Sequence, residues 1–100
     1  MTQRELSKLY TDLNQSFFRG RLPRFRVRLK VMSQRIDKLR GCCDEPSETI
    51  WLSLSLPDDQ IRSVLLHEMC HIGSAGHGVR FRAKLKRLAQ MGETWAENEC

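Results

Sequence analysis

All three histidines of the chain lie in one short stretch, at His67, His71 and His77. The first two flank Glu68 in the order His-Glu-x-x-His, a spacing that turns both imidazoles to the same side of a helix. Neutral imidazole is a common zinc ligand, and catalytic zinc sites use about three protein ligands and leave one position open. The pattern predicts one Zn2+ per chain, held by His67, His71 and His77.

Glu68 is the residue in this motif that could move protons. On a helix it lies beside the metal without being a ligand. Zinc would lower the pKa of a water and polarise a substrate carbonyl. Glu68 would take the proton of that water as general base and pass it to the leaving amine. The expected reaction is hydrolysis of a peptide bond in a protein or peptide substrate.

The residues leave two questions open. Glu93 or Glu97 could replace His77 as third ligand, although His77 is preferred because its geometry requires no assumption about the C-terminal tail. The same motif also fits a metal-dependent nuclease. A third reading is a zinc-containing module that binds nucleic acid or regulates a partner with little turnover.

Apolar residues recurring every three or four positions predict the helices that must carry this site. The first helix starts at a capping-box pattern on Thr2 and ends at Gly20. The second starts at Asp58, an N-cap or first-turn acid, carries the histidine motif and ends at Gly73. The third covers residues 78–91, with its basic side chains outward. The side chains expected to be buried are Leu6, Leu9, Tyr10, Leu13, Phe17, Ile61, Val64, Leu65, Met69, Ile72, Phe81, Leu85 and Leu88.

Stretches that alternate apolar and polar residues predict strands with one buried face. They cover residues 24–31, more weakly residues 38–43, and residues 49–56. Gly41, in the second stretch, indicates a bulge or a close approach of another segment. The inward positions of the first and third strands are Phe25, Val27, Leu29, Val31, Ile50, Leu52, Leu54 and Leu56.

These elements predict an α+β fold in a single domain that spans residues 1–100. Three helices are expected to pack on a small antiparallel three-stranded sheet. Residues 92–100 would form an acidic tail, either a short helical cap or a frayed end.

Basic residues are concentrated in two segments of a chain whose net charge is +5. Residues 19–40 hold nine Lys or Arg and one acid, and residues 80–87 hold five more and no acid. Such segments are either solvated faces or the electrostatic footprint of a nucleic-acid partner. The residues expected to contact DNA are Arg24, Arg26, Arg28, Lys30, Arg80, Lys84 and Arg87.

Composition also indicates the cellular compartment and the state of the cysteines. No apolar run approaches the roughly 20 residues of a membrane helix, and no apolar signal segment follows Met1. We therefore expect a monomer in the cytoplasm, associated with the nucleoid if it binds DNA, and no membrane contact. The four cysteines contain no Cys-x-x-Cys pair, so they are expected as free thiols rather than zinc-ribbon ligands.

Four stretches of the chain resemble the SprT-like metalloprotease family, which includes the Spartan proteases that degrade proteins crosslinked to DNA. They are Leu13-Asn14, residues 17–23 (FFRGRLP), residues 65–71 (LLHEMCH) and residues 77–81 (HGVRF). The resemblance implies a compact zincin-like core whose active-site helix carries the motif. It also implies zinc on the three histidines, Glu68 as catalytic acid and base, and DNA as a partner. The cysteine zinc ribbon of many bacterial relatives is not found in these 100 residues, so DNA contact is expected from the core.

Overall fold

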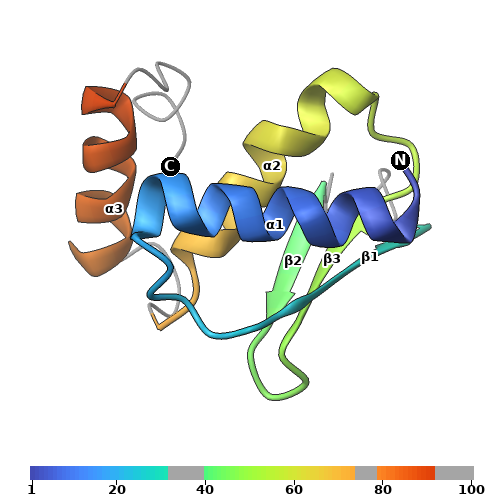
Figure 1. Cartoon of the computed structure of the whole chain (residues 1–100), viewed down its shortest axis with the longest axis horizontal. Helices are drawn as coiled ribbons and strands as arrows, with labels where there is room; N and C mark the ends of the chain where they lie inside the picture. Colours follow the sequence, from blue (N-terminus) through green and yellow to red (C-terminus); the bar gives the residue numbers. More distant parts are fainter. Residues whose placement is uncertain (32–39, 74–78, 92–100) are drawn as a thin grey trace.

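The computed structural model describes residues 1–31, 40–73 and 79–91 (Figure 1). Within these ranges three helices and three strands follow one another along the chain. They are α1 (Gln3–Phe18), β1 (Arg26–Lys30), β2 (Gly41–Asp44), β3 (Thr49–Ser53), α2 (Asp58–Cys70) and α3 (Val79–Gln90). The predicted α+β class and the predicted order of elements are confirmed. None of the described helices is long and apolar enough to cross a membrane.

The sheet is mixed, which corrects the expected antiparallel arrangement. Its strand order is β1-β3-β2, with β2 antiparallel and β1 parallel to the central strand β3. Strands β2 and β3 are joined by the short turn at residues 45–48, and a connection of that length requires an antiparallel pair. Strand β1 carries no such constraint, because residues 31–40 separate it from β2. Alternation along a strand reports its buried face but not the direction of its neighbour.

The parallel pair supplies the buried face of the sheet. Ile50 and Leu52 of β3 lie opposite Val27 and Leu29 of β1. Ile50, Leu52 and Val27 are fully buried, and Leu29 is half-buried against them. The inward positions predicted in the middle of both strands are therefore confirmed.

The predicted ends of two strands are wrong. Val31 and Leu54 were expected to face inward, but their exposed fractions are 83% and 58%. The last pair of the parallel ladder is Lys30 with Ser53, and the final hydrogen bond runs from Leu54 N to Lys30 O at 2.8 Å. Val31 and Leu54 lie at or beyond this point, where the chain leaves the sheet and alternation no longer sets the side-chain direction.

Helix α1 begins as its sequence predicts. The Thr2 hydroxyl accepts from the Glu5 backbone N–H at 3.1 Å, and the Glu5 carboxylate accepts from the Thr2 N–H at 2.8 Å. The helix ends at Phe18, slightly before the expected Gly20, because Arg19 already adopts the left-handed conformation with φ 56°. The segment after α1 runs back along the helix and is attached to it, because the Tyr10 hydroxyl of α1 donates to Pro23 O at 2.7 Å.

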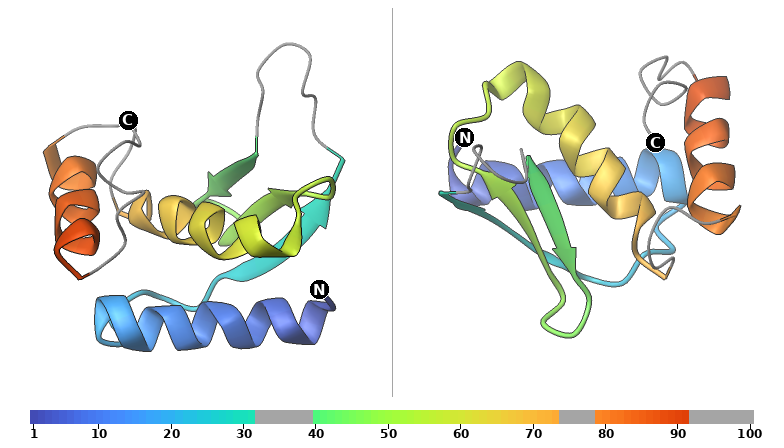
Figure 2. Two further views of the ribbon diagram at one scale, coloured as in Figure 1. Left: turned by 90° about the horizontal axis from the view of Figure 1, so that it is seen from above. Right: turned by 180° about the vertical axis from the view of Figure 1, so that it is seen from behind.

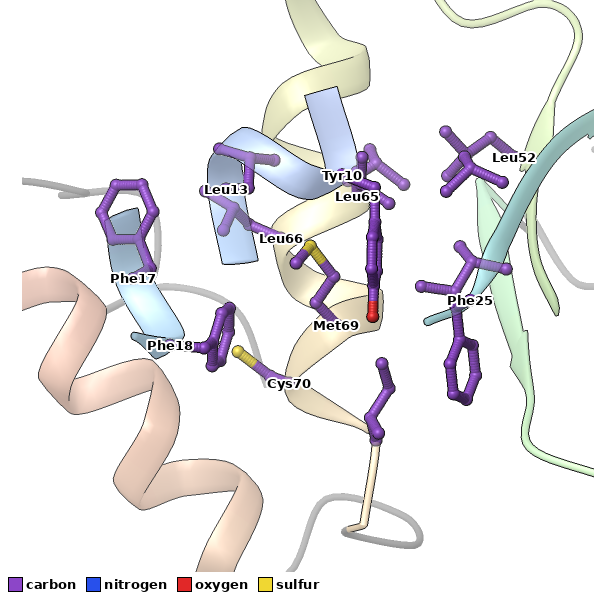
Figure 3. Close-up of a cluster of buried hydrophobic side chains, with 14 of the residues drawn as sticks. Tyr10, Leu13, Phe17, Phe18, Phe25, Leu52, Leu65, Leu66, Met69 and Cys70 are labelled. Atoms are coloured by element: carbon purple, nitrogen blue, oxygen red, sulfur yellow. The ribbon is translucent and has the colours of Figure 1, made fainter. Parts of the chain in front are cut away.

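The hydrophobic core lies between α1, α2 and the sheet (Figure 3). Leu65, Leu66 and Met69 of α2 are fully enclosed in it, and Cys70 packs beside Phe18, as expected of a packing residue. Each such apolar side chain contributes roughly 1.5–3 kcal/mol through burial. Helix α3 stands at the end of the molecule remote from β1, next to the C-terminal end of α1 (Figure 2). The core therefore fixes α2 on several sides, and α2 carries the histidine motif.

Candidate metal centre

His67, Glu68 and His71 come together at the C-terminal end of α2. One potential ligand atom from each residue lies within 4.8 Å of the others. The two histidines are half-buried, and Glu68 has an exposed fraction of 7%. Two imidazoles and a carboxylate at such separations suit a divalent metal such as zinc. Among the described residues, this is the cluster of His, Cys, Asp and Glu with metal-site spacing.

The helix ends within the motif. His71 is the residue that caps α2, and its N–H donates to Glu68 O at 3.0 Å. Gly73, where the sequence predicted the end, has φ +76°, a conformation that glycine adopts without strain. At the other end Asp58 lies in the first turn rather than at the N-cap, which is Pro57. The site thus occupies the point at which the chain leaves the helix.

Phe81 of α3 holds both imidazole rings. Its ring stacks on His71 with centroids 4.2 Å apart and an interplanar angle of 19°. It meets His67 edge-on at 5.1 Å, and the two imidazoles are 5.3 Å apart. Phe81 is fully buried, as predicted. Its contact with the two histidines was not predicted, because apolar spacing shows that a side chain faces inward but not which residues it meets.

Glu68 packs against a glycine in the sheet. A Cβ placed on Gly41 of β2 would lie 3.1 Å from Glu68 Cγ and 3.1 Å from Val64 Cγ1. It would also lie 3.2 Å from the backbone oxygen of Trp51. These distances are tighter than ordinary van der Waals contacts. The close approach predicted at Gly41 is confirmed, and the segment that approaches is the helix that carries Glu68.

The two cysteines near the site are not reactive thiolates. Burial and, to a lesser extent, the nearby Glu68 carboxylate together raise the pKa of Cys43 to about 12. Burial also raises the pKa of Cys70 to about 12. Both thiols are therefore protonated at neutral pH, and the described cysteines are free, as expected.

Lys84 turns toward the end of α2. Its ammonium donates to Ile72 O at 2.7 Å and to Cys70 O at 3.2 Å. The side chain is half-buried, and burial lowers the pKa of its ammonium from the usual value. This placement differs from the outward one expected for the basic side chains of α3. Helix periodicity alone places Lys84 one turn from Phe81, on the same side of α3.

Glu45, in the turn between β2 and β3, contacts the same end of the helix. Its carboxylate Oε1 accepts from the N–H of Gly73 at 3.1 Å. The carboxylate also acts on Lys84, favouring the charged ammonium. The backbone that follows His71 is therefore held from two elements, the β2–β3 turn and α3.

The structure separates the basic residues of β1 from those of α3. Strand β1 and helix α3 lie at opposite ends of the molecule (Figure 1). Apart from Lys84, the residues expected to contact DNA are all exposed: Arg24, Arg26, Arg28, Lys30, Arg80 and Arg87. The ammonium of Lys30 lies 5.0 Å from the ring centre of Trp51, and the guanidinium of Arg87 lies 5.9 Å from that of Phe18. The basic residues of β1 are thus remote from those of α3, whereas Arg87 lies beside the C-terminal end of α1, where the first basic segment begins.

The proposed third ligand lies outside the described residues. His77 falls in the range 74–78, and the alternative ligands Glu93 and Glu97 fall in the range 92–100. What the structure places is the pair His67 and His71 with Glu68 beside them.

Comparison with protein-family models matches residues 6–99 to the SprT-like family. The chain belongs to the SprT-like family. The match to the SprT-like family covers the whole sheet, α2, α3 and most of α1, so it includes every residue of the cluster. No match was found among curated proteins or among solved structures.

Proposed function

We propose that this SprT-like chain is a zinc-dependent metallopeptidase with a zincin-like core, in which α2 is the active-site helix. The observation that carries the proposal is the convergence of His67, Glu68 and His71, whose ligand atoms lie within 4.8 Å of one another. Membership of the SprT-like family supports the same chemistry. The domain has one such cluster among its described residues, so one zinc ion per chain is proposed.

The proposed zinc ligands are His67, His71 and His77. Phe81 keeps the first two imidazoles in place, because it stacks on one ring and meets the other edge-on. When bound, zinc supplies the positive charge that acidifies a water and polarises the substrate carbonyl. The remaining chemistry is done by the side chains around it.

Glu68 is the proposed general base and acid. Its carboxylate accepts the proton of the attacking water as the oxygen adds to the carbonyl carbon of the substrate. The same carboxylate then gives the proton to the amide nitrogen as the bond between carbon and nitrogen breaks. The side chain needs a fixed position for this exchange, and its Cγ is confined between α2 and the backbone at Gly41.

The sheet offers a way to bind an extended substrate. In the described part of the chain β2 is an edge strand, since it pairs with β3 alone. Its first residue, Gly41, touches Glu68. A peptide that added to this edge through backbone hydrogen bonds would run past the carboxylate. This mode would recognise the backbone of an unfolded or mobile segment rather than one side chain.

Replacement of Glu68 by glutamine tests the reaction. Glu68→Gln keeps the shape of the side chain and removes the base, so cleavage of casein should fall by about 10²–10⁴-fold while one zinc per chain is retained. Asp12→Asn, the same change on the exposed side of α1, is the matched control and should cleave normally. Equal activity of the two variants would exclude Glu68 as the base.

The same samples separate the alternative functions. A zinc-loaded wild type that cuts DNA or RNA but no protein would favour a metal-dependent nuclease. A zinc-loaded wild type that cuts neither would favour a nucleic-acid-binding or regulatory module. Absence of bound zinc in mass spectrometry would overturn the metal site itself.

We further propose that DNA contacts the exposed side of β1. Arg26, Arg28 and Lys30 occupy alternate positions of this edge strand, and all are exposed. Such contacts make affinity fall steeply with salt concentration. Arg28→Glu should weaken DNA binding and reduce its salt dependence more than Lys8→Glu, the same charge change on α1. An equal effect of both variants would mean that only net charge matters.

A further inference from the structure

The metal-site end of α2 is held by a lysine that the proposed reaction does not use. Lys84 Nζ donates to the backbone oxygens of Cys70 and Ile72, the residues on either side of His71. Backbone carbonyls at a helix C-terminus lack helical partners and carry the negative end of the helix dipole. An ammonium between two of them is a strong, charge-assisted cap. Its position therefore bears directly on the backbone of one proposed ligand.

The same side of α3 contacts the ligand rings. Phe81 precedes Lys84 by one helical turn, and its ring stacks on His71 at 4.2 Å. Helix α3 thus makes two contacts at His71: Phe81 stacks on its ring, and Lys84 binds the backbone on either side of it. The first contact constrains the ring of His71, and the second constrains the residues on either side of it.

Glu45 completes the hold from the other side. Its carboxylate accepts from the Gly73 N–H at 3.1 Å, and it also favours the charged state of Lys84. Lys84 therefore holds the backbone oxygens on both sides of His71, and Glu45 holds the N–H of Gly73, two residues after it. This backbone also leads directly toward residues 74–78, which include His77.

We infer that Lys84 is a positioning residue of the metal centre, which sets the backbone at His71 and the direction in which the chain leaves α2. The inference rests on the proposed function, because it assumes that His67 and His71 bind zinc. Lys84 does not touch the metal or the substrate in this role. It acts through the two carbonyl groups, in the way that outer-shell hydrogen bonds orient metal ligands in other sites.

The sign of the effect separates positioning from simple electrostatics. A nearby ammonium repels a metal cation, so removal of its charge alone would strengthen zinc binding. Loss of positioning acts in the opposite direction, because the ligands then spend less time in the binding geometry. Outer-shell partners typically contribute 10–100-fold to metal affinity. A weaker affinity after the charge is removed therefore identifies positioning.

Zinc affinity of Lys84→Met, measured by chelator competition on the folded full chain, tests the inference. Methionine keeps the apolar stem and removes the charge and the donors, so we expect about 10–100-fold weaker binding than in the wild type. Lys86→Met is the matched control, since Lys86 is an exposed lysine of the same helix, and its affinity should equal that of the wild type. Circular dichroism of the metal-free proteins verifies that both variants are folded.

Three results would overturn the inference. Equal zinc affinity of Lys84→Met and Lys86→Met, or tighter binding by Lys84→Met, would remove the positioning role while leaving the proposed zinc site intact. Failure of the wild type to bind zinc would overturn both proposals together. If Lys84→Met does not fold, Lys84→Gln decides the same comparison, because its amide cannot reproduce the charged cap to both carbonyls.

Discussion

Substitution of Gly41 by alanine probes the contact between the sheet and Glu68, the proposed catalytic carboxylate. Gly41 does not have a positive φ, so alanine can adopt its backbone conformation. Alanine is favoured over glycine by roughly 0.5–1 kcal/mol in a strand interior, and by no more than that at Gly41, the first residue of β2. Against this, the added Cβ would lie 3.1 Å from Val64 Cγ1 and 3.2 Å from Trp51 O. Overpacking of this kind costs about 1–3 kcal/mol, so the net expectation is a destabilisation of about 1–2 kcal/mol.

Denaturant unfolding of the Gly41→Ala variant measures this difference. In a domain of this size the corresponding loss in Tm is on the order of 4–15 °C. Peptidase activity should also fall under conditions in which the variant is fully folded. The reason is that the added Cβ would lie 3.1 Å from Glu68 Cγ and displace the carboxylate. Cys42→Ala, at an exposed position of the same strand, is the control and should leave both quantities nearly unchanged. A Gly41→Ala variant as stable and as active as the wild type would refute the close-approach argument.

Two further perturbations address the surroundings of the metal centre. Phe81→Ala should cost about 3–5 kcal/mol in unfolding free energy and weaken zinc binding, whereas a variant that binds zinc normally would contradict ring stacking on His71 as a constraint. The pKa values of Cys43 and Cys70 are raised to about 12, above the usual value of 9.0, so the stability that they contribute is complete below about pH 9 and is lost as the pH rises toward about 12. Thiol labelling at pH 8 should accordingly modify exposed Cys42 before Cys43 and Cys70, and equally fast labelling of buried Cys70 would contradict its burial.

Features governed by nearby residues could be predicted from the sequence. The capping box at Thr2 forms as expected, because both of its hydrogen bonds join residues three positions apart. Gly73, predicted to end α2, adopts the left-handed conformation in the turn just after the helix, whose last residue is Cys70. His67, Glu68 and His71 were found for the same reason, since their spacing on one helix is sufficient to bring them together.

Features that depend on distant segments could not be predicted in this way. The direction of β1 is set by its pairing with β3. In the sequence β2 lies between these two strands, and in the sheet β2 forms the opposite edge. The roles of Phe81 and Lys84 depend on how α3 docks against α2, and neither apolar spacing nor charge specifies that docking. A lysine on a helix is usually solvated, so the sequence alone predicts that Lys84 is exposed. In this chain its position next to Phe81 turns it toward the end of α2 instead.

The strand order β1-β3-β2 also has a consequence for how the chain folds. Strands β2 and β3 and helix α2 are consecutive and contact one another, so residues 41–70 can assemble through short loop closures. Arg26 pairs with Thr49 in the parallel ladder. Closing the loop between these two residues costs more entropy than closing the short turn between β2 and β3. We therefore expect the hairpin and α2 to form early, with Gly41 already against Glu68, and β1 to join the sheet afterwards. Glu68, the proposed catalytic base, would then be positioned by the contacts that form between the nearest segments of the chain.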